Sequence, residues 1–267
     1  MPRHLVLRLE GPLLSFGAEA IDNFGVVRDF PAASMLVGLM ANALGWRRED
    51  REAHQNLQDR LVFAARRDRE GSRFTEFQTA QLDGGAQHWT TRGAVEGRRG
   101  GTDTYKSPHL RYRDHDADAA VTVVLRLQQE AHSPNLDEIS HALQYPARPL
   151  FLGRKPCIPS QSLVARDPFV EADYLLAALK AVPLIEDLTV KPHRRKPFIR
   201  IAIPALSREM PEPGWAQERV ADERNWLRGL HGGERRLFIR SIARQDFTNQ
   251  DFARSSSATP PDEKAST

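Results

Sequence analysis

Residues 67–118 form a polar, glycine-rich and basic stretch between two strand-like segments, 61–66 and 121–127. The stretch is therefore predicted to be an arm inserted between two strands of a core. Two tyrosines, Tyr105 and Tyr112, lie among its cations. Between residues 92 and 113 the cations are Arg92, Arg98, Arg99, Lys106, Arg111 and Arg113, and the acids are Glu96 and Asp103, a local balance of six minus two, or +4.

A basic arm that carries aromatic rings suits a nucleic-acid backbone with splayed bases. A solvated surface hairpin has the same composition, and the charge run alone does not separate these two interpretations. The net charge of the whole chain is only +3, so its basic residues are clustered rather than spread. Local clusters on a nearly balanced chain favour a polyanion as the partner.

Composition narrows the class of protein. At 40% hydrophobic and 27% charged residues, the chain can build a core as an ordinary soluble protein does. Its single cysteine, Cys157, excludes an intramolecular disulfide and favours a reducing compartment. No apolar run approaches the ~18 residues of a membrane helix, and a strand-like pattern from Leu5 leaves no room for a signal peptide. We therefore expect a cytoplasmic protein with no membrane partner.

The periodicity predicts one β-α-β unit on each side of the arm. Leu5, Leu7 and Leu9 alternate with other residues, as in a half-buried strand. The remaining predicted elements are a helix over 34–45, strands over 61–66 and 121–127, a short helix opened by Ser133-Pro134, and a strand over 148–153. This order predicts an α+β, ferredoxin-like (RRM-like) domain over residues 1–160, with the arm as a basic β-hairpin thumb at about 74–118.

The predicted helix at 34–45 has one face of small residues. Ser34 is expected to cap it and Gly45 to end it. Ser34, Gly38, Ala41 and Asn42 lie on that face, where a ligand could approach the helix backbone closely, with Ser34 and exposed amides available to a phosphate. Tight packing against the sheet would also explain the small residues.

The part of the chain after Cys157 has a looser pattern. A helix over 172–182 and strands over 198–203 and 237–242 predict a smaller, β-rich part over 161–252. Residues 253–267 have the composition of a disordered tail. The basic cluster over 191–196 is either a contact with target DNA or a solvated loop.

One constellation could support catalysis. Metal-independent RNA cleavage needs a base, an acid and a cation for the phosphate, and Tyr105, Lys106 and His109 lie close together on the arm. RNA binding by the first two, with His109 merely exposed, is the interpretation that we favour. The scattered histidines predict no metal site, and Cys157 lies between prolines with no local base in view, which disfavours a nucleophile.

Four motifs, in order along the chain, resemble those of a known family. They are Leu7 to Pro12 followed by Ser15-Phe16-Gly17; Phe30 to Ser34 followed by Gly38-Leu39 and Ala43-Leu44-Gly45; Tyr112-Arg113 followed by Asp118-Ala119; and Arg148 to Pro159. Together they resemble the CRISPR-associated RAMP proteins of the Cas-five family, in particular the CasD branch found in type I-E Cascade. The resemblance covers about residues 3–165 well and the remainder loosely.

The resemblance implies a ferredoxin-like RAMP domain whose thumb and helix hold RNA. It implies a non-catalytic subunit that caps the 5′ handle of the CRISPR RNA (crRNA) and joins the backbone subunit (CasC) to the large subunit (CasA), with target DNA nearby and no cofactor. The type I-C sibling is a ribonuclease that uses a Tyr, a Lys and a His, so a metal-independent endoribonuclease is the alternative function.

The residues expected to bind RNA share a basic, aromatic or small polar side chain near the predicted thumb, helix and fourth strand. They are Arg28, Ser34, Asn42, Arg47, Arg92, Arg98, Arg99, Tyr105, Lys106, Arg111, Tyr112, Arg113, Arg154 and Lys155. Tyr105 or Tyr112 is expected to stack on an unpaired base. The chain has Ala32-Ala33 where relatives often have Thr followed by a basic residue, so a phosphate contact there is expected to be either lost or supplied by Arg28 or Arg47.

Overall fold

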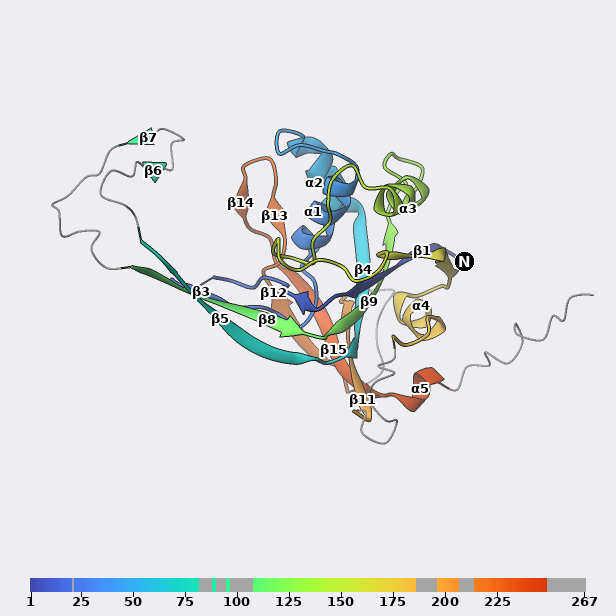
Figure 1. Cartoon of the computed structure of the whole chain (residues 1–267). Coiled ribbons are helices and arrows are strands. Elements are labelled where there is room, and N and C mark those ends of the chain that lie inside the picture. Colours follow the sequence, from blue (N-terminus) through green and yellow to red (C-terminus); the bar gives the residue numbers. More distant parts are fainter. Residues whose placement is uncertain are drawn as a thin grey trace, which may run out of the picture.

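A seven-stranded antiparallel sheet forms the body of the protein (Figure 1). The computed structural model describes residues 1–20, 22–81, 108–185, 196–206 and 214–248, and the backbone of the short strands β6 (His88–Trp89) and β7 (Val95–Glu96). In spatial order the sheet contains β10 (Val164–Glu171), β1 (Arg3–Glu10), β9 (Ala120–Leu127), β4 (Leu61–Arg69), β11 (Phe198–Pro204), β15 (Arg235–Ala243) and β12 (Ala216–Val220). The fold is thus a mixture of helices and antiparallel sheets.

Helices cover both faces of this sheet. They are α1 (Ala33–Ala43), α2 (Arg51–Arg60), α3 (Leu136–Gln144), α4 (Leu175–Ala181) and α5 (Gln245–Thr248). Because side chains alternate along a strand, Leu5 and Leu7 pack in a core with α1 and α3, while Val6 packs in a second core with α4 and Phe247 of α5. None of the described helices is long and apolar enough to cross a membrane.

The first four strands of the body lie in the order β10-β1-β9-β4, and all neighbours are antiparallel. The prediction of a strand over 148–153 was wrong, because the fourth strand is β10. Side chains and amides hold the 148–153 segment in an irregular path: Arg148 donates to the carbonyls of Gly45 and Trp46, and the Leu152 amide donates to Cys157. The Leu152 carbonyl also accepts from the Ser15 amide, so both backbone groups of Leu152 are bonded outside the seven-stranded sheet.

The strands of the C-terminal part extend the same sheet. β11 hydrogen-bonds with β4, with Arg200 opposite Arg67 and Ala202 opposite Ala65, and β15 and β12 follow. The helix and two strands predicted in this part are confirmed as α4, β11 and β15. The tail over 253–267 lies outside the described residues.

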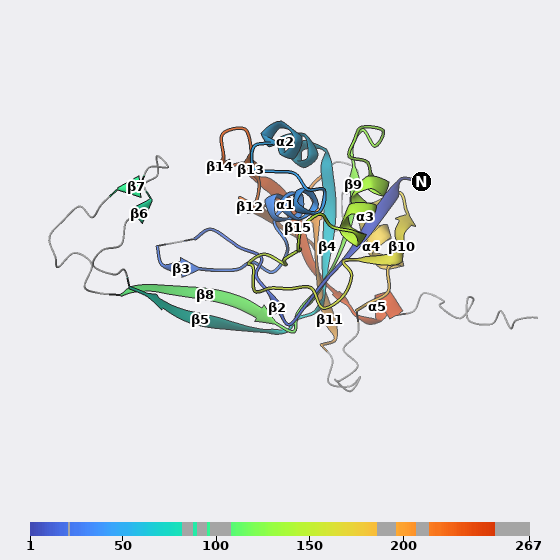
Figure 2. The same cartoon turned by 45° about the horizontal axis from the view of Figure 1, so that its top comes forward.

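A second sheet carries a long hairpin away from the body (Figure 2). Its two long strands are β5 (Ser72–Ala80) and β8 (His109–Ala117), which pair antiparallel along their whole length. β8 also pairs with the short strands β2 (Leu13–Leu14) and β3 (Phe24–Gly25). The hairpin leads to the segment between β5 and β8, where the sequence predicts the tip of the basic arm.

Local sequence signals for the helix ends were partly right. α1 ends as expected, with Gly45 at φ +81°. The expected cap was wrong, because α1 begins at Ala33 and no side chain caps it. α3 begins at Leu136, where Asn135 and Glu138 form a capping box. Helix α2, which the sequence analysis did not predict, connects α1 to β4.

Candidate nucleic-acid interface

A groove of about 590 Å³ lies beside the small-residue face of α1. Ser34, Gly38 and Asn42 line it at a helical spacing of four residues, as expected for one face of a helix. The opposite walls come from the segments 15–18 and 151–154 and from the hairpin of β13 (Arg224–Asn225) and β14 (Leu230–His231). Ala41, also expected on this face, is buried in the body and does not line the groove. The small residues therefore border an open groove at three positions and pack in the body at the fourth.

The sequence analysis expected the first amides of α1 to be available to a phosphate, but other groups of the chain already occupy them. The Ala33 amide donates to Asp222 Oδ2 at 3.2 Å and the Ser34 amide to the Asp222 carbonyl at 3.0 Å. Arg235 holds the Asp222 carboxylate at 2.7–2.9 Å. The carboxylate and the backbone carbonyl of Asp222 thus already satisfy these two amides, which are usual anion ligands at a helix start.

Asn42 and Gly153 shape the wall of the groove. The Asn42 side-chain amide donates to the Pro149 carbonyl at 2.7 Å and fastens the 148–153 segment to α1. Gly153 has φ +106°, and a Cβ there would lie 1.9 Å from the Ser15 carbonyl oxygen. Only glycine fits this close approach of two backbone segments, which explains the Leu152-Gly153 pair in the sequence.

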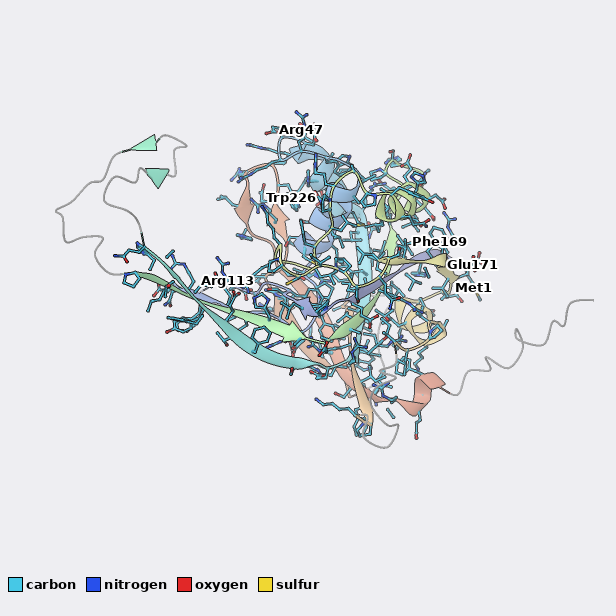
Figure 3. All side chains as sticks on the ribbon, in the orientation of Figure 1. Met1, Arg47, Arg113, Phe169, Glu171 and Trp226 are labelled. Carbon is cyan, nitrogen blue, oxygen red and sulfur yellow. The ribbon has the colours of Figure 1, made fainter. Side chains whose placement is uncertain are left out.

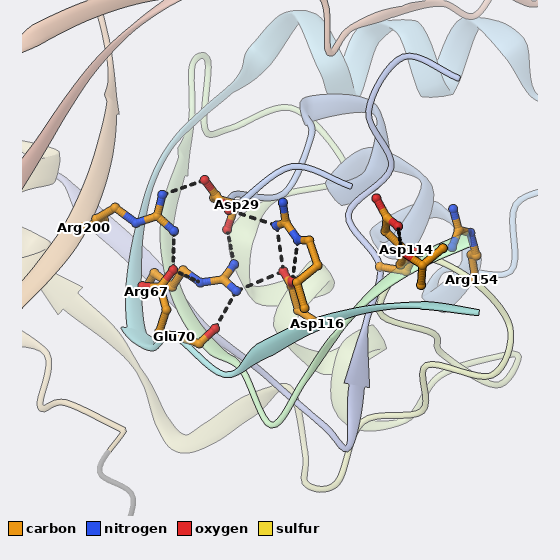
Figure 4. A network of polar contacts seen from close by, with 10 residues as sticks. Asp29, Arg67, Glu70, Asp114, Asp116, Arg154 and Arg200 are labelled. Atoms are coloured by element: carbon orange, nitrogen blue, oxygen red, sulfur yellow. Dashed lines mark hydrogen bonds and ion pairs between the residues drawn. The ribbon is translucent and has the colours of Figure 1, made fainter. Parts of the chain in front are cut away.

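Arg154 connects this wall to the hairpin. Its guanidinium donates to the carbonyls of Asp114 in β8 and Gly25 in β3, both at 2.8 Å, as the close-up in Figure 4 shows for the Asp114 region. Burial lowers the pKa of Arg154, and the like charge of Arg113 lowers it further. Arg154 therefore has a structural role, and it also places a second positive charge beside Arg113.

The cations on the hairpin itself are accessible. Arg111 and Arg113 are exposed on β8, and Lys155 is exposed next to Arg154. A Cβ built on Gly25 would lie 2.6 Å from Arg154 Nη2 and 3.6 Å from Arg113 Cγ, so both arginines approach this glycine. These four cations are the basic edge: Arg111, Arg113, Arg154 and Lys155. A concentration of like charges at an accessible surface favours an anionic partner.

Tyr112 lies between two phenylalanines instead of standing free. Its ring stacks on Phe24, with centroids 4.9 Å apart and an interplanar angle of 13°, and lies 5.3 Å from Phe77. Phe24 and Phe77 are both paired with Tyr112 in the strand register. The sequence analysis did not select either phenylalanine. It identified only Tyr112 of this cluster, from the alternation Arg111-Tyr112-Arg113.

A closed network of charged side chains anchors the base of the hairpin (Figure 4). The members of this ion ring are Asp29, Arg67, Glu70, Arg73, Asp116 and Arg200. Arg67 is 2% exposed and donates to Asp116 at 2.9 Å, and Arg73 bridges Asp116 and Asp29 at 2.9 and 3.0 Å. The ring ties β5 and β8 to β4 and β11 in the body, so it sets the direction of the hairpin.

The geometry therefore presents a groove, a basic edge and exposed rings at one end of the body. The family model described as "CRISPR-associated protein (Cas_Cas5)" matches residues 4–236. The chain belongs to this family. The curated "CRISPR system Cascade subunit CasD" of Escherichia coli (strain K12) is 30% identical over 159 residues, which cover 59% of this chain and 67% of that protein.

Two solved structures have folds similar to that of this chain. One, titled "CRISPR RNA-guided surveillance complex", has a TM-score of 0.61 at 23% identity and covers 90% of each chain. Another, titled "Crystal structure of Cas protein", has a TM-score of 0.55 at 25% identity over 90% of this chain and 94% of that one. The first likeness, at this identity, concerns the fold alone.

Two of the residues expected to bind RNA in this Cas5-family chain lie elsewhere. Arg28 donates to Glu19 at 3.1 Å and its side chain is 17% exposed. Arg47 is exposed on the loop between α1 and α2, well away from Arg113 in Figure 3. The two residues proposed to replace a phosphate contact therefore do not converge on the groove.

The remaining expected residues lie outside the described part of the chain: Arg92, Arg98, Arg99, Tyr105 and Lys106. His109 is described, and it is exposed at the start of β8. The cluster that would cleave RNA is therefore untested, as is the basic run over 191–195.

Cys157 does have a base nearby, contrary to the sequence analysis. Its Sγ lies 3.7 Å from His115 Nδ1, and His115 Nε2 lies 3.2 Å from Glu76 Oε2. However, the cysteine is fully buried, and burial raises the pKa of its thiol. A buried, protonated thiol is a poor nucleophile, so these contacts support packing beneath the hairpin.

The C-terminal part contributes groove residues that the sequence analysis missed. Trp226 and His231 line the groove opposite α1. The Trp226 ring stacks on His54 at 4.7 Å and its Nε1 donates to Gln58 at 2.9 Å, so α2 holds it in place. No local pattern could have placed a residue so distant in sequence beside Gly38.

Proposed function

We propose that this protein is a non-catalytic, crRNA-binding subunit of a type I CRISPR effector (Cascade) complex. In this role it caps the 5′ handle of the mature RNA. Membership of the Cas5 family and the likeness to CasD of E. coli Cascade support the assignment to the complex. The observation that best supports RNA binding is that Arg113 and Arg154 both approach Gly25 at an accessible edge of the sheet.

The fold supports the same proposal at finer detail. Strands β1, β4, β9 and β10 with α1 and α3 have the order of a ferredoxin-like core, which is also the scaffold of RNA-recognition modules. The hairpin of β5 and β8 is the proposed thumb, and the ion ring holds it against the body. The handle backbone would follow the groove beside α1 and leave along the basic edge.

The partners follow from the proposed place in the complex. The subunit would link the backbone subunit (CasC) to the large subunit (CasA) in the cytoplasm, with target DNA bound nearby. Co-purification of the three proteins with crRNA tests this linkage. Recovery of RNA with this chain but without either subunit would contradict the linking role.

The first experiment incubates the purified chain with labelled precursor RNA and, separately, with mature crRNA, both in EDTA. We expect binding that depends on the 5′ handle, and no cleavage. The binding should weaken as the salt concentration rises, because phosphate contacts release counterions. Specific cleavage at the base of the repeat hairpin that His109→Ala removes would replace this proposal with a metal-independent endoribonuclease. Equal binding to RNA without the handle would contradict the capping role.

A further inference from the structure

Three aromatic rings stand in register across three strands of the hairpin sheet. Phe24 of β3 pairs with Tyr112 of β8, and Tyr112 pairs with Phe77 of β5. Adjacent residues of neighbouring strands have their side chains on the same face of a sheet. The rings therefore form a continuous row, with Tyr112 in the middle.

The outer rings of this row are unusually exposed. Phe24 is 50% exposed and Phe77 is 55% exposed. Because the Phe24 ring is nearly parallel to Tyr112, Tyr112 covers one of its faces. β3 lies at the edge of the second sheet, so the other face of Phe24 is positioned to continue the stack.

Cations lie on the other face of this edge of the sheet, because neighbouring residues of a strand point to opposite faces. Gly25 follows Phe24, and Arg113 follows Tyr112. Arg154 reaches Gly25 from the groove wall, within 2.8 Å of the carbonyl oxygen. A ligand that crosses the edge strand β3 therefore meets an aromatic ring on one face of the sheet and two guanidinium groups on the other.

We propose that Phe24, backed by Tyr112, is a stacking platform for an unpaired base of single-stranded RNA, with Phe77 extending it. This inference rests on the proposed function and names the surface through which the RNA is held. An unpaired nucleotide combines a flat π face with a phosphate, which matches the rings and the basic edge. A purely apolar partner would leave Arg113 and Arg154 without a role in binding.

The test is a double-mutant cycle, in which RNA affinity is measured for variants of the protein, of the RNA, and of both together. Phe24→Ala should weaken binding of handle RNA by about 5- to 100-fold, the usual contribution of one stacked base. Phe24→Trp should retain the affinity, and its indole fluorescence should be quenched when RNA binds. Phe198→Ala is the matched control, since Phe198 is 60% exposed on β11 in the body, and it should leave affinity unchanged.

The RNA side of the cycle locates the base. Replacing handle nucleotides one at a time with an abasic linker should reveal one position whose loss is not additive with Phe24→Ala. Thermal unfolding of each variant, with Phe24→Tyr as a conservative replacement, separates lost stacking from a misfolded hairpin. Strictly additive losses at every position would overturn the platform.

Failure of this inference is distinguishable from failure of the proposed function. If wild-type protein does not bind handle RNA, the proposed function fails. If RNA binds and Arg113→Gln weakens it while Phe24→Ala and Phe77→Ala do not, the function stands and the platform is wrong. Loss of subunit assembly with unchanged RNA affinity would show that the rings are a protein contact, which also overturns the platform.

Discussion

The ion ring and the basic edge use the same kind of side chain for opposite purposes. In the ion ring, Arg67 and Arg73 contact the carboxylate of Asp116, and Arg67 is almost fully buried. At the basic edge, Arg113 is exposed, and burial together with the like charge of Arg113 lowers the pKa of neighbouring Arg154. Buried cations paired with carboxylates build the hairpin, whereas the exposed cations of the basic edge, which outnumber the one carboxylate opposite Arg113, Glu76, are suited to an anion from outside.

The two regions lie on one strand. Asp116 belongs to the ion ring and Arg113 to the basic edge, only three residues apart on β8. An odd separation along a strand places side chains on opposite faces. The charge balance of the arm therefore says little about any single arginine; the face that it occupies decides its role.

The largest effect is expected from Arg67→Met, which breaks the ion ring. The substitution leaves the carboxylate of Asp116, 3% exposed, without one of its partners. The free energy of unfolding should fall by about 3–5 kcal/mol, as it does when one partner of a buried ion pair is removed. Urea unfolding at pH 7 measures this change. A loss below 1 kcal/mol would show that the ring does not anchor the hairpin.

The basic edge should respond in RNA affinity. Each lost phosphate contact should flatten the slope of log affinity against log salt concentration by about 0.7 on single strands. Arg111→Gln combined with Arg113→Gln should therefore change the slope by about 1.4 and weaken binding about 25-fold at 0.1 M salt, relative to affinities that are equal at 1 M. Titrations at several salt concentrations give both quantities. Arg219→Gln, at an exposed arginine of β12, is the control; an equal loss there would mean that binding is diffuse.

A smaller effect, dependent on pH, is expected from Asp29→Asn. Burial alone would raise the pKa of Asp29, but Arg200, Arg67 and Arg73 outweigh it and hold that pKa below its ordinary value of 3.8. A carboxyl whose pKa is lower in the folded state stabilises the fold above its unfolded pKa, and this stability disappears as pH falls through the folded value.

The stability difference between wild type and Asp29→Asn should therefore be about 1 kcal/mol at pH 7, since Asp29 is partly exposed. It should shrink as the pH falls below about 4. Urea unfolding from pH 3 to pH 7 measures it. A difference that does not vary with pH would contradict the ionic origin.

The smallest effect on stability is expected from Arg113→Met, the same substitution as in the ion ring but at the basic edge. Exposed positions away from buried contacts usually change the free energy of unfolding by less than 0.5 kcal/mol. A loss close to that of Arg67→Met would remove the distinction between the two regions.

Much of the fold could be predicted from local sequence. Alternation at Leu5, Leu7 and Leu9 and the end signal at Gly45 indicated β1 and the end of α1, because a strand and a helix end depend on neighbouring residues. The motifs were equally local, and they led to the family that the comparison confirms. The accessible cations Arg111, Arg113 and Lys155 were likewise among the residues predicted from composition.

Other features depend on contacts between segments distant in sequence, and these the tertiary structure alone decided. Ser34 has the side chain of a helix cap, but Asp222 from the C-terminal part satisfies the first amides of α1. Arg154 resembles a free cation in the sequence, but the carbonyls of Asp114 and Gly25 hold it. The sequence by itself determined where strands, helices and basic residues lie along the chain, because these follow from neighbouring side chains. Folding decided which cations are neutralised by carboxylates and which remain accessible, because electrostatic pairing depends on distance in space.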